Sequence, residues 1–251
     1  MSESLFIIAL LLFFIIAALY SSIGHAGASG YLAVMALLSF APESIKPTSL
    51  ILNIVVAAIA SYKFIKEGYF DRRIFISFIL FSLPAAFIGG YITVSSLYFK
   101  ILAGLFLIVS SILIVLKKKT DGPVDKHSER SLVLTGIIGV TIGFISGIIG
   151  VGGGIFLTPV LIMMNWTTVK KASGISALFI LCNSISGLLG HLSSLPKIDS
   201  NIAYWVIAVA LGGALGSYFG TKKFNNRIII WCLFLVLLSA GLKFILVDAF
   251  K

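Results

Sequence analysis

The chain has 251 residues, of which 59% are hydrophobic and 11% are charged, and its formal net charge is +10. Because a soluble domain of this length carries roughly 25% charged residues, the composition excludes a soluble catalytic domain and indicates a polytopic membrane protein. The basic residues gather in short segments between apolar runs, which is the pattern of cytoplasmic membrane loops and not of nucleic-acid binding.

Ten apolar runs follow one another along the chain, each bounded by turn or charge signals. They lie near residues 5–23, 29–41, 47–65, 74–94, 98–116, 132–149, 153–164, 170–191, 201–220 and 227–247. Most approach the ~20 residues that a helix needs to cross a bilayer, so the sequence predicts an all-α polytopic membrane protein. The runs 29–41 and 153–164 are too short to span.

Each short run follows a cluster of small residues, at 24–30 or at 150–154. Glycine weakens a helix, and non-helical backbone is tolerated in a membrane only where protein shields it or where it lines a wet cavity. We therefore expect the segments 5–41 and 132–164 each to form a broken or re-entrant helix pair that is hinged at its small residues.

The distribution of basic residues supports this arrangement. If each hinged pair enters and leaves on one face and every other run crosses once, 14 of the 19 Lys and Arg residues share a face. They are Lys63, Lys66, Arg72, Arg73, Lys117, Lys118, Lys119, Lys126, Arg130, Lys170, Lys171, Lys222, Lys223 and Arg227. By the positive-inside rule this face is cytoplasmic, which places both termini on the other side of a cell membrane (inner or plasma membrane). Lys46 and Lys100 are counted with the loops of that other side, and no Lys or Arg is expected at mid-membrane depth.

The two halves of the chain resemble each other. Gly30 aligns with Gly154 at an offset of 124 residues, and Ser49 then falls on Ser173. Each half has an odd number of crossings in this topology, so the two repeats must lie in opposite orientations, as they do in many secondary transporters.

The expected organisation has three parts. A first transmembrane repeat covers residues 1–116, a cytoplasmic linker covers 117–131, and an inverted second repeat covers 132–251. Each repeat is expected to contain a broken or re-entrant helix pair followed by three transmembrane helices.

The second glycine cluster carries a family resemblance. The stretch GFISGIIGVGGGIFLTPVL, from Gly143 to Leu161, and the Lys-Lys-Ala-Ser helix start that follows it resemble the TauE/SafE sulfite exporter family, also called the TSUP transporters. The resemblance covers nearly the whole chain, because the first half carries a degraded copy with His25 and Ser29 in its small-residue cluster. It implies alternating-access transport of sulfur-containing or related organic anions, such as sulfite, thiosulfate or sulfonates, with export as the favoured direction.

The hinges also predict where an anion would bind. Helix N-termini carry unpaired N–H groups and a partial positive charge, and half-helices that start near Ser29 and Gly153 in opposed repeats would both point at the midplane. Glycine at these points lets an anion approach bare N–H donors. The candidate substrate-binding residues are His25, Gly27, Ser29, Gly30, Ser49, Asn53, Gly150, Gly152, Gly153, Gly154, Ser173 and Asn183.

A structural role competes with substrate contact at several of these positions. His25 is either a substrate contact or proton carrier, or a hydrogen-bonded packing residue. Asn53 and Asn183 either contact the anion or bridge helices, as buried amides in lipid do. Ser49 and Ser173 either contact the anion or cap helix starts.

Acidic residues are informative by their positions. All nine Asp and Glu residues lie in or beside loops, which disfavours a proton pump built on buried carboxylates, a cation site and a membrane enzyme that needs an acid.

We expect no catalytic residue, no metal and no cofactor. The expected partners are a small anionic substrate and the lipid bilayer but no nucleic acid, and a homodimer is left open. The alternatives to a transporter are an anion channel and, less favoured, a membrane-embedded enzyme.

Overall fold

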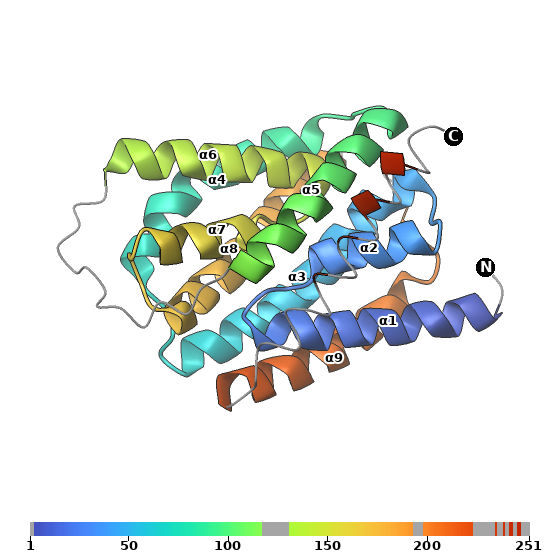
Figure 1. Ribbon diagram of the computed structural model, residues 1–251, viewed down its shortest axis with the longest axis horizontal. Helices are drawn as coiled ribbons and strands as arrows, with labels where there is room; N and C mark the ends of the chain where they lie inside the picture. The colour runs from blue at the N-terminus through green and yellow to red at the C-terminus, as the bar shows by residue number, and fades with distance from the viewer. Residues whose placement is uncertain are drawn as a thin grey trace.

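The computed structural model describes residues 3–116, 131–192 and 198–222, together with residues 234, 238, 241, 242, 245 and 246. Its three continuous ranges contain nine α-helices and no strand (Figure 1). The helices are α1 (Glu3–Ser22), α2 (Ala28–Leu37), α3 (Pro42–Lys66), α4 (Arg72–Tyr91), α5 (Ser96–Leu116), α6 (Leu132–Ile149), α7 (Gly154–Met163), α8 (Val169–Leu192) and α9 (Ile202–Lys222). Most of the predicted linker 117–131 and of the predicted run 227–247 lies outside the described residues.

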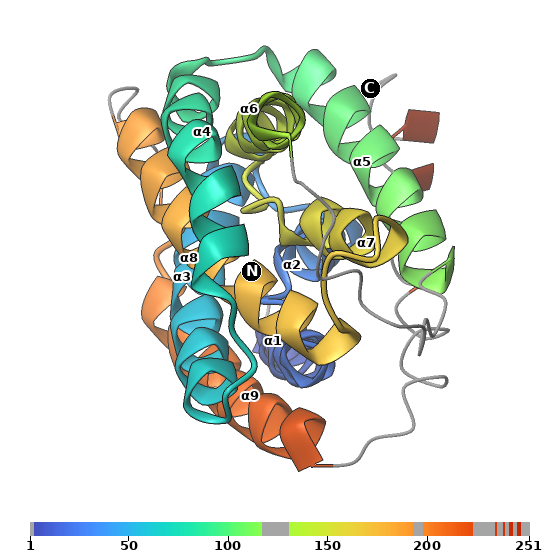
Figure 2. The ribbon, with the colours of Figure 1, turned by 90° about the vertical axis from the view of Figure 1, so that its left-hand side faces the viewer.

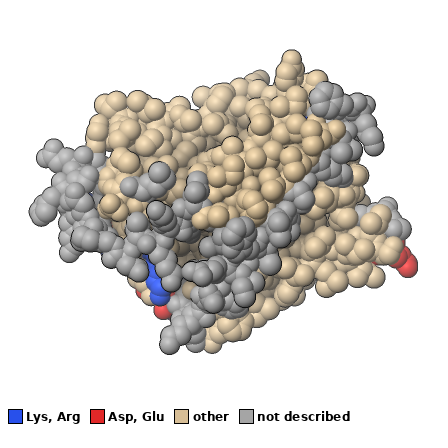
Figure 3. Space-filling view, viewed as in Figure 1, with Lys and Arg blue, Asp and Glu red and all other residues tan. Residues whose placement is uncertain are grey.

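The all-α membrane fold that the sequence predicts is confirmed. Among the described residues, six helices are long and apolar enough to cross a bilayer, namely α1, α3, α4, α6, α8 and α9. Large apolar side chains such as Leu80, Val133 and Leu211 are exposed on their outer faces, as a lipid-facing surface requires. In the view of Figure 3, the charged side chains of described residues lie toward the two ends of the long axis.

The two short helices begin differently from their long neighbours. Asp71 caps α4, because its side chain accepts hydrogen bonds from the N–H groups of Arg73 and Ile74. By contrast, the residues that precede α2 and α7 are Gly27 and Gly153, which have φ values of 100° and 79° and offer no side-chain cap. Glycine adopts this left-handed conformation without steric cost, so each short helix can start abruptly from a non-helical hinge.

Helices of the two halves are interleaved. α1 packs along α9, α4 packs along α6, and α3 packs against α8. In both ribbon views, α2 and α7 lie between the α1–α9 pair and the α4–α6 pair (Figure 1, Figure 2). The short helices and their hinges therefore sit in the interior, where the surrounding helices shield their non-helical backbone from lipid.

Glycine faces bring the paired helices close together. On α9, a Cβ atom added at Gly212, Gly216 or Gly220 would collide with a backbone carbonyl oxygen of α1, and on α6 the same holds for Gly143 and Gly147 against α4. The spacing of four residues places these glycines on one helix face. It is the small-residue pattern that lets membrane helices associate through backbone contact.

Equivalent backbone features recur in the two halves at an offset of 126 residues. Gly24 and Gly150 have φ values of 76° and 86°, and Gly27 and Gly153, three positions later, directly precede α2 and α7. The predicted alignment of Gly30 with Gly154 is therefore shifted by two residues, because the structural counterpart of Gly154 is Ala28, the first residue of α2. The two repeats share their backbone conformation, but the first repeat has other residues at positions where the second has glycine. An alignment that matches residue types therefore differs from the structural one. The opposite orientation of the two repeats stays a prediction.

Candidate functional site

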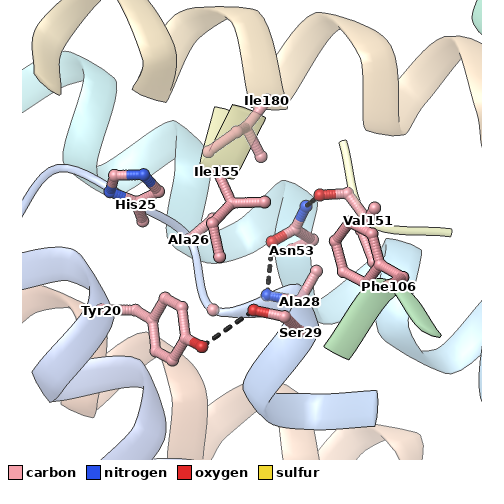
Figure 4. Close-up of a pocket in the computed structure, with 11 residues that line it drawn as sticks. Tyr20, His25, Ala26, Ala28, Ser29, Asn53, Phe106, Val151, Ile155 and Ile180 are labelled. Carbon is pink, nitrogen blue, oxygen red and sulfur yellow. Dashed lines mark hydrogen bonds between the residues drawn. The ribbon is translucent and has the colours of Figure 1, made fainter. Parts of the chain in front are cut away.

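The two hinges meet in the interior of the molecule. Residues 23–27 separate α1 from α2, and residues 150–153 separate α6 from α7. A small cavity lies between them, bounded by the first turns of both short helices (Figure 4). The lining residues are Tyr20, His25, Ala26, Gly27, Ala28, Ser29, Asn53, Phe106, Val151, Ile155 and Ile180.

The cavity is too small for an anion in this structure. Its volume of about 10 Å³ is near the minimum that one water molecule needs. An oxyanion of four or more heavy atoms does not fit into such a space, so the surrounding helices must separate before an anion can enter.

Asn53, on α3, links the two hinges. Its buried side chain accepts a hydrogen bond at Oδ1 from the backbone N–H of Ala28 (3.2 Å), and its Nδ2 donates to the carbonyl oxygen of Val151 (3.3 Å) and to Oγ of Ser184 (2.8 Å). The partners fix the orientation of the amide, because a backbone N–H only donates and a backbone carbonyl only accepts. The Asn53 oxygen thus accepts a hydrogen bond from a backbone N–H at the positive, N-terminal end of α2. An anion would use a donor of the same kind.

Ser49 and Ser173 each bind the hinge of the opposite half. Ser49 Oγ, on α3, donates to the carbonyl oxygen of Gly150 (3.0 Å), and Ser173 Oγ, on α8, donates to the carbonyl oxygen of Ile23 (2.8 Å). Neither serine precedes its helix, since α3 begins at Pro42 and α8 at Val169, so helix capping does not explain them. Each serine instead satisfies a carbonyl that the hinge removes from helical hydrogen bonding.

His25 cross-links the first hinge to α7. Its Nδ1 lies 3.3 Å from the carbonyl oxygen of Ile23, and its Nε2 lies 3.3 Å from Oγ1 of Thr158, which in turn donates to Oγ of Ser176 (2.7 Å). The carbonyl only accepts, so the first bond requires a proton on Nδ1. The side chain is 5% exposed and also lines the cavity, so its hydrogen-bonded packing role and its position at the site coexist.

The hinge glycines are held in place by crowding as well as by backbone conformation. Gly152 has a φ of 70°, and a Cβ atom there would lie 2.6 Å from Ser184 Oγ and 2.8 Å from Asn53 Nδ2. At Gly153 a Cβ atom would lie 2.6 Å from Cγ2 of Ile142, and at Gly154 it would collide with the Ile180 side chain. The second hinge therefore requires glycine where the backbone passes close to α6 and α8.

The candidates that line the cavity are His25, Gly27, Ser29 and Asn53. Among the other eight, two serve helix packing. Asn183 accepts a hydrogen bond at Oδ1 from Ser82 Oγ (2.8 Å), which ties α8 to α4, and it is not among the lining residues. Gly30 faces the side chains of Ile16 and Tyr20, so it serves the packing of α2 on α1. Their polar or small character in an apolar run singled them out, but helix packing gives each another role.

The sequence analysis missed several polar residues of the site. Tyr20 is one of them, and its hydroxyl oxygen forms a buried hydrogen bond (2.8 Å) with that of Ser29, a predicted site residue, beside the cavity (Figure 4). Thr158 and Ser176 are the others, and they connect His25 to α7 and α8. These residues are hydroxyl-bearing positions inside apolar segments, which was an available signal. Many other hydroxyl-bearing residues share that property, so the signal alone does not select these three.

The chemistry of the site suits an anion more than a cation. None of the described residues that line the cavity is Asp or Glu, and the part of the chain that the structure describes contains no group of three potential metal ligands. The groups directed at the cavity are helix N-termini, hydroxyls, an amide and an imidazole. Neutral donors and positive helix ends stabilise negative charge without a mid-membrane Lys or Arg.

One basic residue is not where the sequence placed it. Lys46, which we counted with the loops, is the fifth residue of α3 and is only 6% exposed. It lies against the second hinge, because a Cβ atom at Gly150 would be 3.0 Å from Cγ of Lys46. The correction arises because α3 begins at Pro42, several residues before the apolar run that predicted it.

Comparisons with known proteins agree on one class of protein. The family model described as "Sulfite exporter TauE/SafE" matches residues 9–244. A probable membrane transporter protein of Sinorhizobium fredii is 38% identical over 200 residues, which are 79% of this chain and 81% of the relative. A probable membrane transporter protein of Methanocaldococcus jannaschii is 32% identical over 178 residues, which are 67% of this chain and 65% of that relative. No solved structure gives a match.

Proposed function

Because the chain belongs to the sulfite exporter TauE/SafE family, we propose that it is a secondary transporter that exports small sulfur-containing or organic anions by alternating access. The family model and the relatives indicate a membrane transporter. Sulfite, thiosulfate and sulfonates are the substrates that the proposal names.

The main support for the proposal is that the N-termini of two short helices, α2 and α7, meet at one cavity. Ala28 at the start of α2 and Ile155 in the first turn of α7 both line it, and the lining residues include no carboxylate. A doubly charged oxyanion would receive N–H donors and partial positive charge from two sides. The hydroxyls of Tyr20 and Ser29 and the imidazole of His25 would complete its coordination.

Asn53 supports a cycle in which the anion replaces an internal ligand. In this structure, Asn53 Oδ1 accepts a hydrogen bond from the Ala28 N–H while its Nδ2 donates to the carbonyl oxygen of Val151. An anion that takes over the Ala28 N–H would release Asn53 from α2, and the link between the hinges would loosen. Substrate binding and hinge movement are thereby coupled, as alternating access requires.

The direct test is flux into proteoliposomes of purified protein. We expect uptake of ³⁵S-labelled sulfite or thiosulfate, and faster uptake when the vesicles are preloaded with the same anion, because an exchanger is accelerated by substrate on the far side. Uptake without such acceleration would favour an anion channel. Flux of a monovalent cation, with no flux of any sulfur-containing or organic anion, would overturn the proposal.

A further inference from the structure

Lys46 is a buried cation that does not line the hinge cavity. Lys46 Nζ donates a hydrogen bond to the carbonyl oxygen of Gly90 (3.1 Å), near the end of α4. His191, near the end of α8, interacts electrostatically with Lys46 and hydrogen-bonds the backbone of the same Gly90. An ammonium group and an imidazole thus converge on one point between α3, α4 and α8.

No acid among the described residues forms an ion pair with Lys46. Among residues 3–116, 131–192 and 198–222, the one ion pair within 4 Å joins Lys63 to Glu67, on the opposite end of α3 from Lys46. Burying a lone charge in a membrane protein is costly, so such a group is usually functional. The negative C-terminal end of α4 compensates part of the charge of Lys46. Its hydrogen bond to the Gly90 carbonyl oxygen, however, uses only one of the three N–H donors of the ammonium group.

The position of Lys46 connects it to the hinge cavity. Its side-chain stem lies against Gly150, and Ser49, one turn further along α3, donates to the Gly150 carbonyl oxygen. In the predicted topology, the start of α3 and the ends of α4 and α8 all face the non-cytoplasmic side. An ion beside Lys46 would therefore lie between that side and the second hinge.

We propose that Lys46 and His191 form a second anion site, which holds the transported anion between the hinge cavity and the non-cytoplasmic side. The proposal rests on the proposed function, since it assigns the same anion to both sites. The buried ammonium group of Lys46, which gives one N–H donor to Gly90, provides charge-assisted hydrogen bonds to an oxyanion, and the neighbouring imidazole adds an uncharged hydrogen-bonding group. The hinge cavity supplies only neutral donors, helix ends and His25, so the outer site adds the full positive charge that the inner one lacks.

The test compares Lys46→Gln, Lys46→Arg and the control Lys100→Gln. Lys100 is the other described lysine on the same predicted side and is only partly buried. We expect Lys46→Gln to raise the half-saturating sulfite concentration about tenfold, the loss expected for one charge-assisted hydrogen bond. Lys46→Arg should retain most of the affinity because it keeps the charge, and Lys100→Gln should match the wild type. His191→Gln should give a smaller increase than Lys46→Gln.

A second measurement does not depend on transport. Sulfite should raise the thermal unfolding midpoint of the detergent-purified wild type, and Lys46→Gln should reduce this shift while Lys100→Gln keeps it. A Lys46→Gln protein that is destabilised but keeps the wild-type sulfite affinity and thermal shift would overturn the proposal, because Lys46 would then only cap α4. Absence of flux in the wild type would instead count against the proposed function, and the thermal shifts would still report on the outer site.

Discussion

At the scale of single residues, the site is organised by polar side chains that hold backbone from the other half of the molecule. Asn53 and Ser49 bind the second hinge, and Ser173 binds the first. In a membrane interior, an unpaired carbonyl or N–H group has no water molecule with which to form a hydrogen bond. The same bonds that make each hinge tolerable therefore also fix its geometry, and a substrate that competes for them can move it.

Replacement of Asn53 by Asp tests the sign of charge that the cavity accepts. A carboxylate at this position would lie on the Ala28 N–H, cancel the positive end of α2 and repel an anion. We expect Asn53→Asp to lower sulfite uptake per folded molecule at least tenfold, as measured in proteoliposomes after size-exclusion chromatography.

The matched control is Asn183→Asp. Asn183 is equally buried but lies away from the cavity, where it accepts a hydrogen bond from Ser82. The Asn183→Asp variant should lose about as much thermal stability as Asn53→Asp, because both bury a carboxylate. It should keep uptake within about twofold of the wild type, since the carboxylate still accepts the hydrogen bond from Ser82. Equal loss of uptake in both variants would show that a buried carboxylate anywhere in the bundle is harmful, and would remove the argument for Asn53.

At the scale of helices, the decisive feature is that α2 and α7 are short and start from left-handed glycines. Ten residues of helix span only about 15 Å, so neither helix crosses the membrane, and each N-terminus ends in the interior beside the cavity. A longer helix would carry its positive end to the surface, where water would screen it.

The start of α7 can be tested with a pair of glycines that share one backbone conformation. Gly153 and Gly68 both have a φ of 79°, but a Cβ atom at Gly153 would lie 2.6 Å from Ile142, whereas at Gly68 nothing lies within 4 Å. Each Gly→Ala change should cost about 1 kcal/mol for the left-handed conformation. Only Gly153→Ala should also displace the start of α7.

We therefore expect Gly153→Ala to lower uptake at least tenfold and Gly68→Ala to leave it within about twofold of the wild type, both normalised to folded protein. Thermal unfolding in detergent separates the shared backbone cost from the extra clash. Wild-type uptake by Gly153→Ala would mean that the position of the α7 N-terminus is not critical for the substrate.

At the scale of the whole molecule, helices pair across the two halves. The α1–α9 and α4–α6 pairs are held by backbone contact at glycines, and the hinged helices lie between the pairs (Figure 2). Close glycine packing resists internal deformation. We therefore expect the two pairs to move as units during transport, with the hinges and the α3–α8 contact between them.

The predicted topology can be tested with single cysteines in a Cys182→Ala, Cys232→Ala background. Ser95, between α4 and α5, is expected on the non-cytoplasmic side, and Lys66, at the end of α3, on the cytoplasmic side. A membrane-impermeant maleimide should label Ser95→Cys in intact cells and Lys66→Cys only after lysis. The reverse pattern would invert the topology and move the Lys46 site to the cytoplasmic side.

Much of the fold could be predicted from the sequence because the information is local. Hydropathy placed the described helices close to their observed bounds, and the clusters at 24–30 and 150–154 located both hinges. For the candidate site, the hinge positions and the absence of buried acids were also readable. The partners of His25 and Asn53 were not, because Thr158 and Val151 lie about a hundred residues or more away along the chain.

What the sequence determined by itself is the class of protein, the positions of the hinges and the apolar, acid-free interior, since these follow from composition and from the local cost of glycine and charge in lipid. The tertiary structure alone decided that Asn53 bridges both hinges, that Asn183 and Gly30 serve packing, and that Lys46 is buried beside Gly150. These facts depend on the rotation and register of packed helices. Periodicity cannot distinguish the faces of a helix that is apolar all round, so only the packing assigns each polar residue its neighbour.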